Sequence, residues 1–509
     1  MLLVCSAIGP RPDPSPPPVA EILAAYDRAT HAAESETMEE QGTLSGDGLT
    51  GEFHSWRHAT DERDEERLGP RVETTLHVGD RIWVRNESGN VRELSGYLRR
   101  RARTEEFIDS GAFVKAPERS RYLGFGTLAG RGAWRIEVNA DGGEPETLWI
   151  DAESGLPLRL EYLDGDGPTT IDFSDWREVG GRRVPFTSLS SDGDHAFDVI
   201  EKTTALTVNQ PIDPSVFAPL ANNAIEATGA QTVPLLDFDG HAGCRITLGG
   251  KPFSFLLDTG AQSVVVDTRV AREAGIDQQG SLEVRGAVRT GGLHVATLPP
   301  LGIGSATLRG IIGASIDLSG STRGMAKFDG ILGYPFFAAA LVELDFKRGL
   351  MRFGPPGSFE PRGERIALDV DRELPEAVLR VDGRVSAPFI VDIGNSGELL
   401  IYKPFADLHP GIAPFTGNAT SNIGIGGSTA TFRTQVDRIE LGEIPMYRRT
   451  TDVVLATTGA FADQVDAGNL GLGTLREFIV TFDLAHNAMY LERGADFDDG
   501  ARRRDTTGS

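Results

Sequence analysis

Two stretches of the chain, 255–260 and 389–394, carry the residue types of an acid–base pair. They read Phe-Leu-Leu-Asp-Thr-Gly and Phe-Ile-Val-Asp-Ile-Gly, so Asp258 and Asp392 each follow an apolar run and precede a glycine by two residues. A glycine there lets the backbone turn its N–H groups toward the carboxylate. Two carboxylates about 3 Å apart cannot both ionise, so such a pair shares one proton. One can then activate water while the other protonates a carbonyl oxygen, which suits peptide hydrolysis without a metal or a covalent intermediate.

The two stretches belong to an internal repeat. Asp392 follows Asp258 by 134 residues, and the later pair Asp345 and Asp483 lies 138 residues apart. A Leu-Gly pair ends twelve residues before each of these later aspartates, so the register holds over more than a hundred residues. Each half reads as many short strands separated by turn residues. We therefore expect one β-lobe at 232–362 and a second at 363–493.

These motifs resemble those of the retropepsin-like and pepsin-like aspartic proteases. The run 255–267 is similar to the first active-site loop of that family. The segments 329–337 and 468–478 are similar to its hydrophobic-hydrophobic-Gly segments, which pass behind the catalytic loops. The resemblance covers about 232–492. It implies a bilobal β fold and an aspartic endopeptidase that acts on peptides or proteins, with no cofactor and no metal.

The resemblance assigns roles to five residues of the two loops. Asp258 and Asp392 match the catalytic dyad, and Gly260 and Gly394 match the turn glycines. Thr259 matches the hydroxyl residue that braces the loop of the opposite lobe. The expected site therefore lies where the two lobes meet.

Other positions depart from the family or are less certain matches to it. Ala261 stands where pepsins place Ser or Thr, and the missing hydroxyl should raise the pKa of the dyad. Ile393 stands where the family has Thr or Ser, so half of the brace is lost unless Asn395 replaces it. Gly291 and Gly292 mark a hairpin that would be the flap over the cleft, without the tyrosine of pepsin flaps. A decayed site that only binds peptide or lipid is therefore the alternative.

The region 19–218 has a different pattern. We expect a helix at 19–33 and then an antiparallel sheet, because runs such as 77–84 and 134–138 alternate with period two. The segments Asp-Ala-Glu-Ser-Gly-Leu-Pro at 151–157 and Val-Pro-Phe at 184–186 resemble periplasmic lipoprotein carriers and sorting proteins. That resemblance implies a curved sheet that could hold a lipid or acyl ligand. A purely structural domain is the alternative reading, and so is an assembly factor of the cell envelope in which both regions are scaffolds.

The amino-acid composition of the chain limits the kinds of molecule that the protein is expected to bind. The 50 basic and 74 acidic residues give a net charge of −24, which argues against nucleic acid and anionic membranes. The two cysteines, Cys5 and Cys244, exclude a disulfide framework, and no histidine or cysteine spacing predicts a metal site. No apolar run is long enough to span a bilayer, so the protein is not expected to be transmembrane.

The ends and the boundary between the regions complete the prediction. Residues 1–18 read like the tail of a secretory signal followed by a Pro-rich segment, which predicts a periplasmic or secreted monomer. A frayed cytosolic N-terminus and lipidation at Cys5 are the alternatives. The polar segment 219–231 is expected to be an exposed linker, and 494–509 a disordered tail. The sequence thus predicts a mainly β protein: a pepsin-like pair of β-lobes preceded by a curved antiparallel β-sheet domain with an N-terminal helix.

Overall fold

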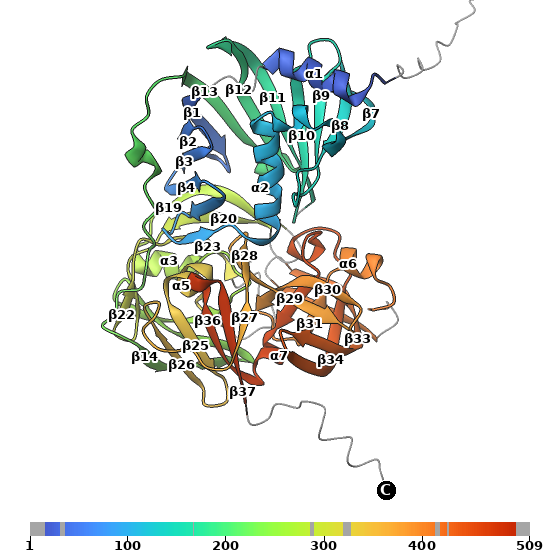
Figure 1. Cartoon of the computed structure of the whole chain (residues 1–509). Coiled ribbons are helices and arrows are strands. Elements are labelled where there is room, and N and C mark those ends of the chain that lie inside the picture. Colours follow the sequence, from blue (N-terminus) through green and yellow to red (C-terminus); the bar gives the residue numbers. More distant parts are fainter. Residues whose placement is uncertain are drawn as a thin grey trace, which may run out of the picture.

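The computed structural model describes residues 16–30, 36–165, 167–285, 290–318, 327–412, 418–424 and 427–494. It confirms the mainly β prediction, with 54% of the chain in strands, and it has the expected N-terminal helix and curved antiparallel sheet. An N-terminal sheet stands above two lobes that lie side by side (Figure 1). The predicted tail beyond residue 494 and the signal-like segment before residue 16 lie outside the described residues.

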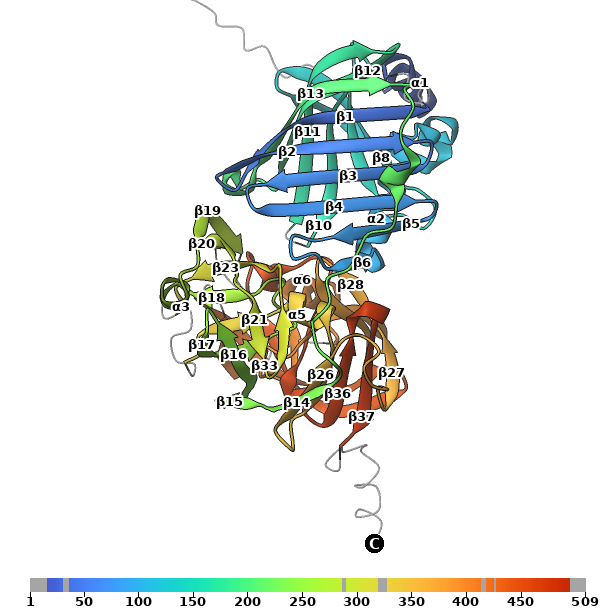
Figure 2. The same cartoon turned by 90° about the vertical axis from the view of Figure 1, so that its left-hand side faces the viewer.

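The N-terminal sheet is antiparallel throughout its described strands. Thirteen of them follow the order β6-β5-β4-β3-β2-β1-β13-β12-β11-β10-β9-β8-β7, so β13 returns to the middle of the sheet and pairs with β1. Figure 2 shows β1 to β5 as a broad, curved face. The strands are β1 (Thr37–Gly46), β2 (Leu49–His58), β3 (Asp61–Leu68), β4 (Arg71–Val78), β5 (Arg81–Arg85), β6 (Val91–Glu93), β7 (Ser120–Leu128), β8 (Arg131–Val138), β9 (Glu146–Asp151), β10 (Pro157–Asp164), β11 (Gly167–Val179), β12 (Arg182–Ser191) and β13 (Val199–Val208).

Two helices lie against this sheet. Helix α1 (Val19–Thr30) buries Ile22, Leu23 and Tyr26, whose ring packs edge-on against Phe113 with 5.1 Å between centroids. Helix α2 (Gly96–Asp109) was not expected from the sequence, because its dense arginine run buries only a narrow stripe of side chains. The run 77–84 also differs from the prediction of one strand. A turn at 79–80 divides it between β4 and β5.

The two lobes repeat one arrangement of strands. In the first lobe β17 pairs in parallel with β24, and in the second β30 pairs in parallel with β35. The described strands of the first lobe are β15 (Leu236–Phe238), β16 (His241–Leu248), β17 (Lys251–Leu257), β18 (Val265–Asp267), β19 (Gln278–Arg285), β20 (Thr290–Thr297), β21 (Leu301–Ile303), β22 (Ala306–Leu308), β23 (Ile312–Ile316) and β24 (Gly330–Leu332). Those of the second are β28 (Asp369–Asp371), β29 (Leu374–Val381), β30 (Val385–Asp392), β31 (Leu399–Ile401), β32 (Asn418–Gly424), β33 (Gly427–Leu441), β34 (Ile444–Val454) and β35 (Gly468–Gly471).

A third sheet joins the lobes. In it β25 pairs with β36, so the repeated segments around Asp345 and Asp483 run antiparallel beside each other. Its described strands are β14 (Gln231–Pro234), β25 (Leu341–Asp345), β26 (Leu350–Gly354), β27 (Glu364–Ala367), β36 (Phe478–Asp483) and β37 (Ala488–Arg493). The lobes also contain the helices α3 (Thr268–Ala274), α5 (Tyr334–Ala339), α6 (Lys403–Leu408) and α7 (Leu472–Leu475).

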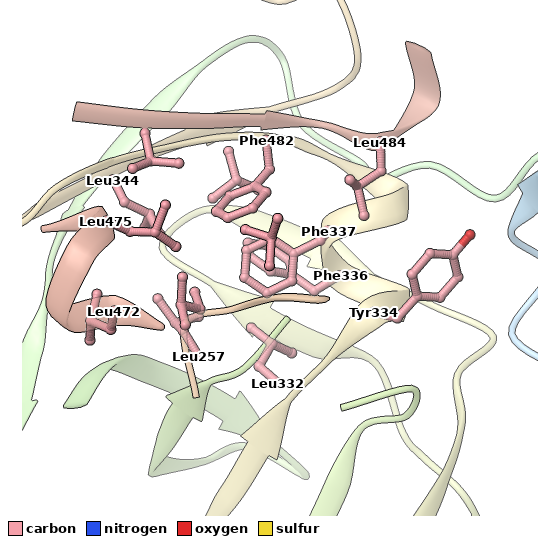
Figure 3. Packing of buried hydrophobic residues seen from close by; sticks show 14 of the residues in the cluster. Leu257, Leu332, Tyr334, Phe336, Phe337, Leu344, Leu472, Leu475, Phe482 and Leu484 are labelled. Carbon is pink, nitrogen blue, oxygen red and sulfur yellow. The ribbon is translucent and has the colours of Figure 1, made fainter. Parts of the chain in front are cut away.

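The largest hydrophobic cluster lies between this sheet and the ends of the parallel strands. Figure 3 shows Phe336 and Phe337 of α5 among Leu257, Leu332 and Phe482. The rings of Phe337 and Phe482 meet edge-on, with 5.4 Å between centroids. Residues of both lobes thus share one core, which fixes the ends of β17 and β24 relative to each other.

Most residues of the segment 219–231 are exposed or half-exposed, but some of them contact the parts that the segment connects. Ile225 is 2% exposed and its N–H donates to the carbonyl of Ala339, because this apolar side chain fills the core of the first lobe. Asn222 accepts a hydrogen bond from the N–H of Val91, and the N–H of Asn223 donates to the carbonyl of Gly89. The segment therefore contacts both parts that it connects.

The N-terminal sheet touches both lobes. Leu49, at the start of β2, packs against an apolar cluster of the first lobe and lies against Gly280 of β19. On the other side, the carboxylate of Asp371 accepts a hydrogen bond of 3.0 Å from the N–H of Leu98, in the first turn of α2. Figure 1 shows α2 running down to this point, beside β28. A carboxylate of the second lobe thus caps a helix of the N-terminal region.

Candidate active site

Asp258 and Asp392 meet where the two lobes touch. Strand β17 ends one residue before Asp258, and β30 ends at Asp392. The parallel partner β24 holds the first loop, because the N–H of Asp258 donates to the carbonyl of Leu332 over 3.2 Å. The two carboxyl groups are hydrogen-bonded to each other, with Asp392 buried and Asp258 half-buried. The structure therefore brings the two repeated aspartates into one site.

The glycine of each loop lies directly against the carboxylate of the other loop. A Cβ atom on Gly260 would lie 2.6 Å from Cγ of Asp392, and one on Gly394 would lie 2.3 Å from Cγ of Asp258. Each glycine N–H also donates to the carboxylate of its own loop, over 2.9 Å in both lobes. Glycine is thus required at both positions for this close approach.

The brace between the loops is present in one half only. The hydroxyl of Thr259 donates to the carbonyl of Val391 over 2.6 Å and accepts from the N–H of Ile393 over 3.0 Å. Ile393 has no hydroxyl to return these bonds, and it is fully buried in the main hydrophobic cluster. The side-chain oxygen of Asn395 accepts from Gly397 N, so that oxygen serves its own loop and not the opposite one.

A pair of polar residues that the sequence analysis did not single out supports Asp392. Nδ2 of Asn469, in β35, donates to Oδ2 of Asp392 over 2.5 Å. The hydroxyl of Tyr402 donates to the amide oxygen of the same asparagine. The signal was available in the sequence. Asn469 is a polar residue inside the hydrophobic-hydrophobic-Gly segment, where the first lobe has Ile331.

The two carboxyls differ in their electrostatic surroundings. Burial raises the pKa of Asp258 well above its ordinary value, and the neighbouring Asp392 raises that pKa further. Burial also raises the pKa of Asp392, but the amide of Asn469 and the N–H groups of Asn395 and Gly394 oppose that rise. The pair titrates as a unit, and the hydrogen bonds that Asp392 accepts favour its ionised form.

Ala261 and the flap candidates occupy the first lobe. The methyl group of Ala261 packs with the apolar cluster that includes Leu256 and Ile331. The raised pKa of Asp258 agrees in direction with the missing hydroxyl, although burial is its largest cause. Gly291 and Gly292 lie in β20 and pair with β19 as the arms of a hairpin. The tip of this hairpin, 286–289, and residues 425–426 of the corresponding hairpin in the second lobe lie outside the described residues.

Other chemistry finds little support among the described residues. They contain no group of three or more His, Cys, Asp or Glu side chains that could hold a metal ion. Cys244 is fully buried, and burial raises the pKa of its thiol to about 12, so it is unreactive at neutral pH. No described helix is both long enough and apolar enough to cross a bilayer.

Comparison of the sequence with protein families agrees with the resemblance of the first loop. The aspartyl protease family model matches residues 244–336. That match includes Asp258, Thr259 and Gly260 and ends before the second lobe. A search of curated proteins finds no significant relative of the chain. The family comparison therefore covers one of the two aspartates.

Comparison with solved structures finds partial likenesses. A domain described as an outer membrane lipoprotein-sorting protein from Vibrio parahaemolyticus is 13% identical, covers 39% of this chain and 97% of its own, and has a TM-score of 0.29. A LolA superfamily protein from Nitrosomonas europaea is 12% identical, with coverages of 40% and 99% and a TM-score of 0.29. A retropepsin-like aspartic protease from Rickettsia conorii is 17% identical, with coverages of 27% and 96% and a TM-score of 0.19. Function must therefore be argued from the residues of this chain.

Proposed function

We propose that the protein is an aspartic endopeptidase that hydrolyses peptide bonds with Asp258, Asp392 and a water molecule. The observation that carries the proposal is the cross-lobe dyad, in which each carboxylate lies against the glycine of the opposite loop. Such packing places two carboxyls in hydrogen-bonding contact, and only a shared proton makes that arrangement stable. A purely structural pair of aspartates has no need of this geometry.

The mechanism follows from the unequal surroundings of the two carboxyls. Asp392, as the carboxylate, takes a proton from water while the water oxygen attacks the carbonyl carbon of the peptide bond. Asp258 gives its proton to the carbonyl oxygen, which yields a neutral tetrahedral intermediate. Asp392 then returns a proton to the departing amine nitrogen, the C–N bond breaks, and Asp258 recovers its proton from the intermediate. No covalent bond to the protein forms.

The direct test is cleavage of a peptide library by the full chain over a range of pH values. We expect products from internal peptide bonds, and a pepstatin-type inhibitor, which carries a hydroxyl in place of the attacking water, should abolish them. The same preparation with Asp258→Asn serves as the control for contaminating proteases. Cleavage that persists in this variant, or that the inhibitor leaves unchanged, contradicts the proposal.

A second candidate function is peptide binding without hydrolysis on the same fold. Ile393 favours it, because the missing half of the brace would loosen the second loop. Binding of library peptides by the wild-type chain with no product after prolonged incubation would identify this alternative. Equal peptide affinity in wild type and in Asp258→Asn would then be expected, since binding does not require proton exchange.

For the N-terminal sheet we propose a ligand with an apolar body and a polar end. A cavity of about 600 Å³ lies between the sheet and the helices α1 and α2. Its lining includes the apolar residues Leu148, Leu160 and Phe173 and also the charged residues Arg57 and Asp109. The interior is thus less apolar than a simple acyl cradle would be. Displacement of a fluorescent fatty acid by candidate lipids, with the full chain, tests this proposal.

We further propose that the protein acts outside the cytoplasm, because residues 1–18 read like the tail of a secretory signal. We also propose that it is a monomer, because one chain supplies both aspartates of the dyad. Fractionation of cells that express the full gene, with an antibody against the chain, tests the location. Light scattering of the purified protein tests the oligomeric state. Recovery in the cytoplasm, or a dimer at micromolar concentration, would contradict the respective part of the proposal.

A further inference from the structure

We infer that Asn469 is a positioning residue for the dyad, whose amide holds Asp392 as the carboxylate that activates water and leaves the shared proton on Asp258. The inference rests on the proposed function and deepens it, because it names what makes two equivalent aspartates play different roles. The family resemblance assigns no role to this position, where the repeat of the first lobe has the apolar Ile331.

The geometry fixes the amide in one orientation. Tyr402 OH donates to the amide oxygen of Asn469, so the NH₂ end is the one that faces Asp392. Asn469 is 3% exposed and Tyr402 is 1% exposed, so water does not compete for either bond. An NH₂ group can only donate, and a carboxylate can only accept. The amide therefore favours the ionised form of Asp392, and a charge-assisted bond of this kind is among the stronger hydrogen bonds in proteins.

The first lobe offers no equivalent donor at this register. Asn469 pairs in β35 with Ile390, two residues before Asp392, and Ile331 pairs in β24 with Leu256, two residues before Asp258. The two positions are therefore structurally equivalent. A branched hydrocarbon side chain has no polar hydrogen, so Ile331 cannot donate to Asp258 as Asn469 donates to Asp392.

The charged groups behind Tyr402 leave its donor role intact. They are Asp463, Asp466 and Arg372, and Arg372 pairs with both aspartates. Burial raises the pKa of Tyr402 well above its ordinary value, so its hydroxyl stays protonated at any pH at which the protein would act. Burial and Asp463 raise the pKa of Asp466 to about 8, which lies above the acidic limb on which the experiment depends.

The test is the pH dependence of kcat/KM in wild type, Asn469→Leu and Tyr402→Phe. Loss of the amide donor makes the charged form of Asp392 less stable, so the acidic limb of the Asn469→Leu profile should move up by about one pH unit. Tyr402→Phe should move it in the same direction by less, because the amide remains but is free to turn. Tyr447→Phe makes the same chemical change on β34 and should leave the limb in place. A merely structural role would lower activity at all pH values alike.

Two outcomes separate this inference from the proposed function. If wild type cleaves peptides and the limb is unmoved in both variants, the role of Asn469 is wrong and the endopeptidase proposal stands. If wild type does not cleave, the endopeptidase proposal fails. The inference is then decided by NMR titration of ¹³C-carboxyl aspartate in the full chain, with Asp392→Asn to assign the signal. A higher apparent pKa in Asn469→Leu, or in Tyr402→Phe if the first variant does not fold, supports the inference, and an unchanged pKa overturns it.

Discussion

The two lobes carry the same loop but have kept different hydrogen bonds around it. The first lobe has the hydroxyl of Thr259, which makes two bonds to the second loop, whereas the second lobe has Ile393 in that place. The second lobe has the amide of Asn469 on its carboxylate, whereas the first lobe has Ile331. The glycines remain in both. Brace and amide donor are thus on opposite sides of the dyad.

This division shows which parts of the site must be symmetric. The mutual approach of carboxylate and glycine is a steric requirement that neither lobe can give up, because any side chain at either glycine would collide with the opposite carboxylate. Hydrogen-bond donors shift the pKa values of the two carboxyls and hold the loops in place, and the number of these donors can differ between the lobes. Such a difference fixes which carboxyl holds the proton, since two identical carboxyls would share it equally.

The largest effect should come from Asp258→Asn and Asp392→Asn. Each should lower kcat/KM by about 10³-fold or more, because each carboxyl exchanges a proton in the mechanism. The matched control is Asp345→Asn, which changes a repeated aspartate outside the dyad and should keep activity. Near-wild-type turnover in Asp392→Asn would show that one carboxyl is sufficient.

The pH profile of kcat/KM should be bell-shaped, with its optimum above the strongly acidic range. Protonation of Asp392 ends activity on the acidic side, and loss of the proton from Asp258 ends it on the alkaline side. Because burial and Asp392 raise the pKa of Asp258 well above its ordinary value, the alkaline limb moves upward. An optimum near pH 2 would contradict the assignment of the proton to Asp258.

The same shifts predict how the dyad affects stability. Both pKa values are higher in the folded chain than in the unfolded one, so folding favours the protonated forms. The stabilisation is complete below the unfolded value near 4 and is lost as the pH rises. Asp258→Asn should therefore raise the thermal midpoint at pH 7 and change it little at pH 3. Calorimetry at the two pH values measures this, and equal shifts at both would count against a charged dyad.

Substitution at Thr259 should lower the unfolding free energy more than substitution at Ile393. Thr259→Val keeps the shape but removes two buried hydrogen bonds, and it should cost about 1–3 kcal/mol of unfolding free energy. Ile393→Thr supplies the hydroxyl that the brace lacks, but it removes an apolar side chain from the core. We therefore expect a net loss of about 1 kcal/mol of unfolding free energy. Urea denaturation compares the two variants. A gain of stability in Ile393→Thr would contradict the second expectation.

The smallest effects concern two contacts between the N-terminal region and the lobes: the apolar contact of Leu49 with the first lobe and the hydrogen bond from Leu98 to Asp371 of the second. Burial raises the pKa of Asp371 to about 6, so its docking under α2 is strongest below about pH 4 and weakens as the pH rises past 6. Limited proteolysis should therefore be a few-fold faster at pH 7 than at pH 5, after correction with an unfolded substrate. Asp371→Asn should reduce this difference, and Leu49→Ala should leave it unchanged. Equal corrected rates of proteolysis at pH 5 and pH 7 in wild type would exclude this pH dependence.

The sequence predicted the parts of the site that repeat. Asp258 and Asp392 and their glycines were found because a period of more than a hundred residues marks them twice, whereas the brace from Thr259 was found from the family resemblance. Asn469 was missed although it visibly departs from the repeat at Ile331, because the sequence does not show which group its side chain reaches. The sequence also did not show that Ile393 packs in the core, because a β-branched residue at this position is compatible with core packing and with the loss of a polar contact.

The N-terminal region shows a similar limit. Period-two patterning predicted the curved sheet, but it did not reveal that α2 lies against it or that the run 77–84 turns back at its centre. The acidic alternation of β3, at Glu62, Asp64 and Glu66, was a visible sign that part of the interior is charged. Docking of this region onto both lobes depends on single contacts such as that of Asp371, which carry no local pattern.

The reciprocal packing of glycine and carboxylate means that neither lobe contains a site of its own. A symmetric pair of first lobes would have two threonines and therefore a complete brace, whereas a symmetric pair of second lobes would have none. One chain does not need either pair, because pairing of β25 with β36 and the covalent link hold the lobes together at a high effective concentration. Because the lobes associate without help from the loops, the loop residue Ile393 can be apolar and the strand residue Asn469 can be an amide donor. Fusion of the lobes is thus the condition under which the dyad can be asymmetric.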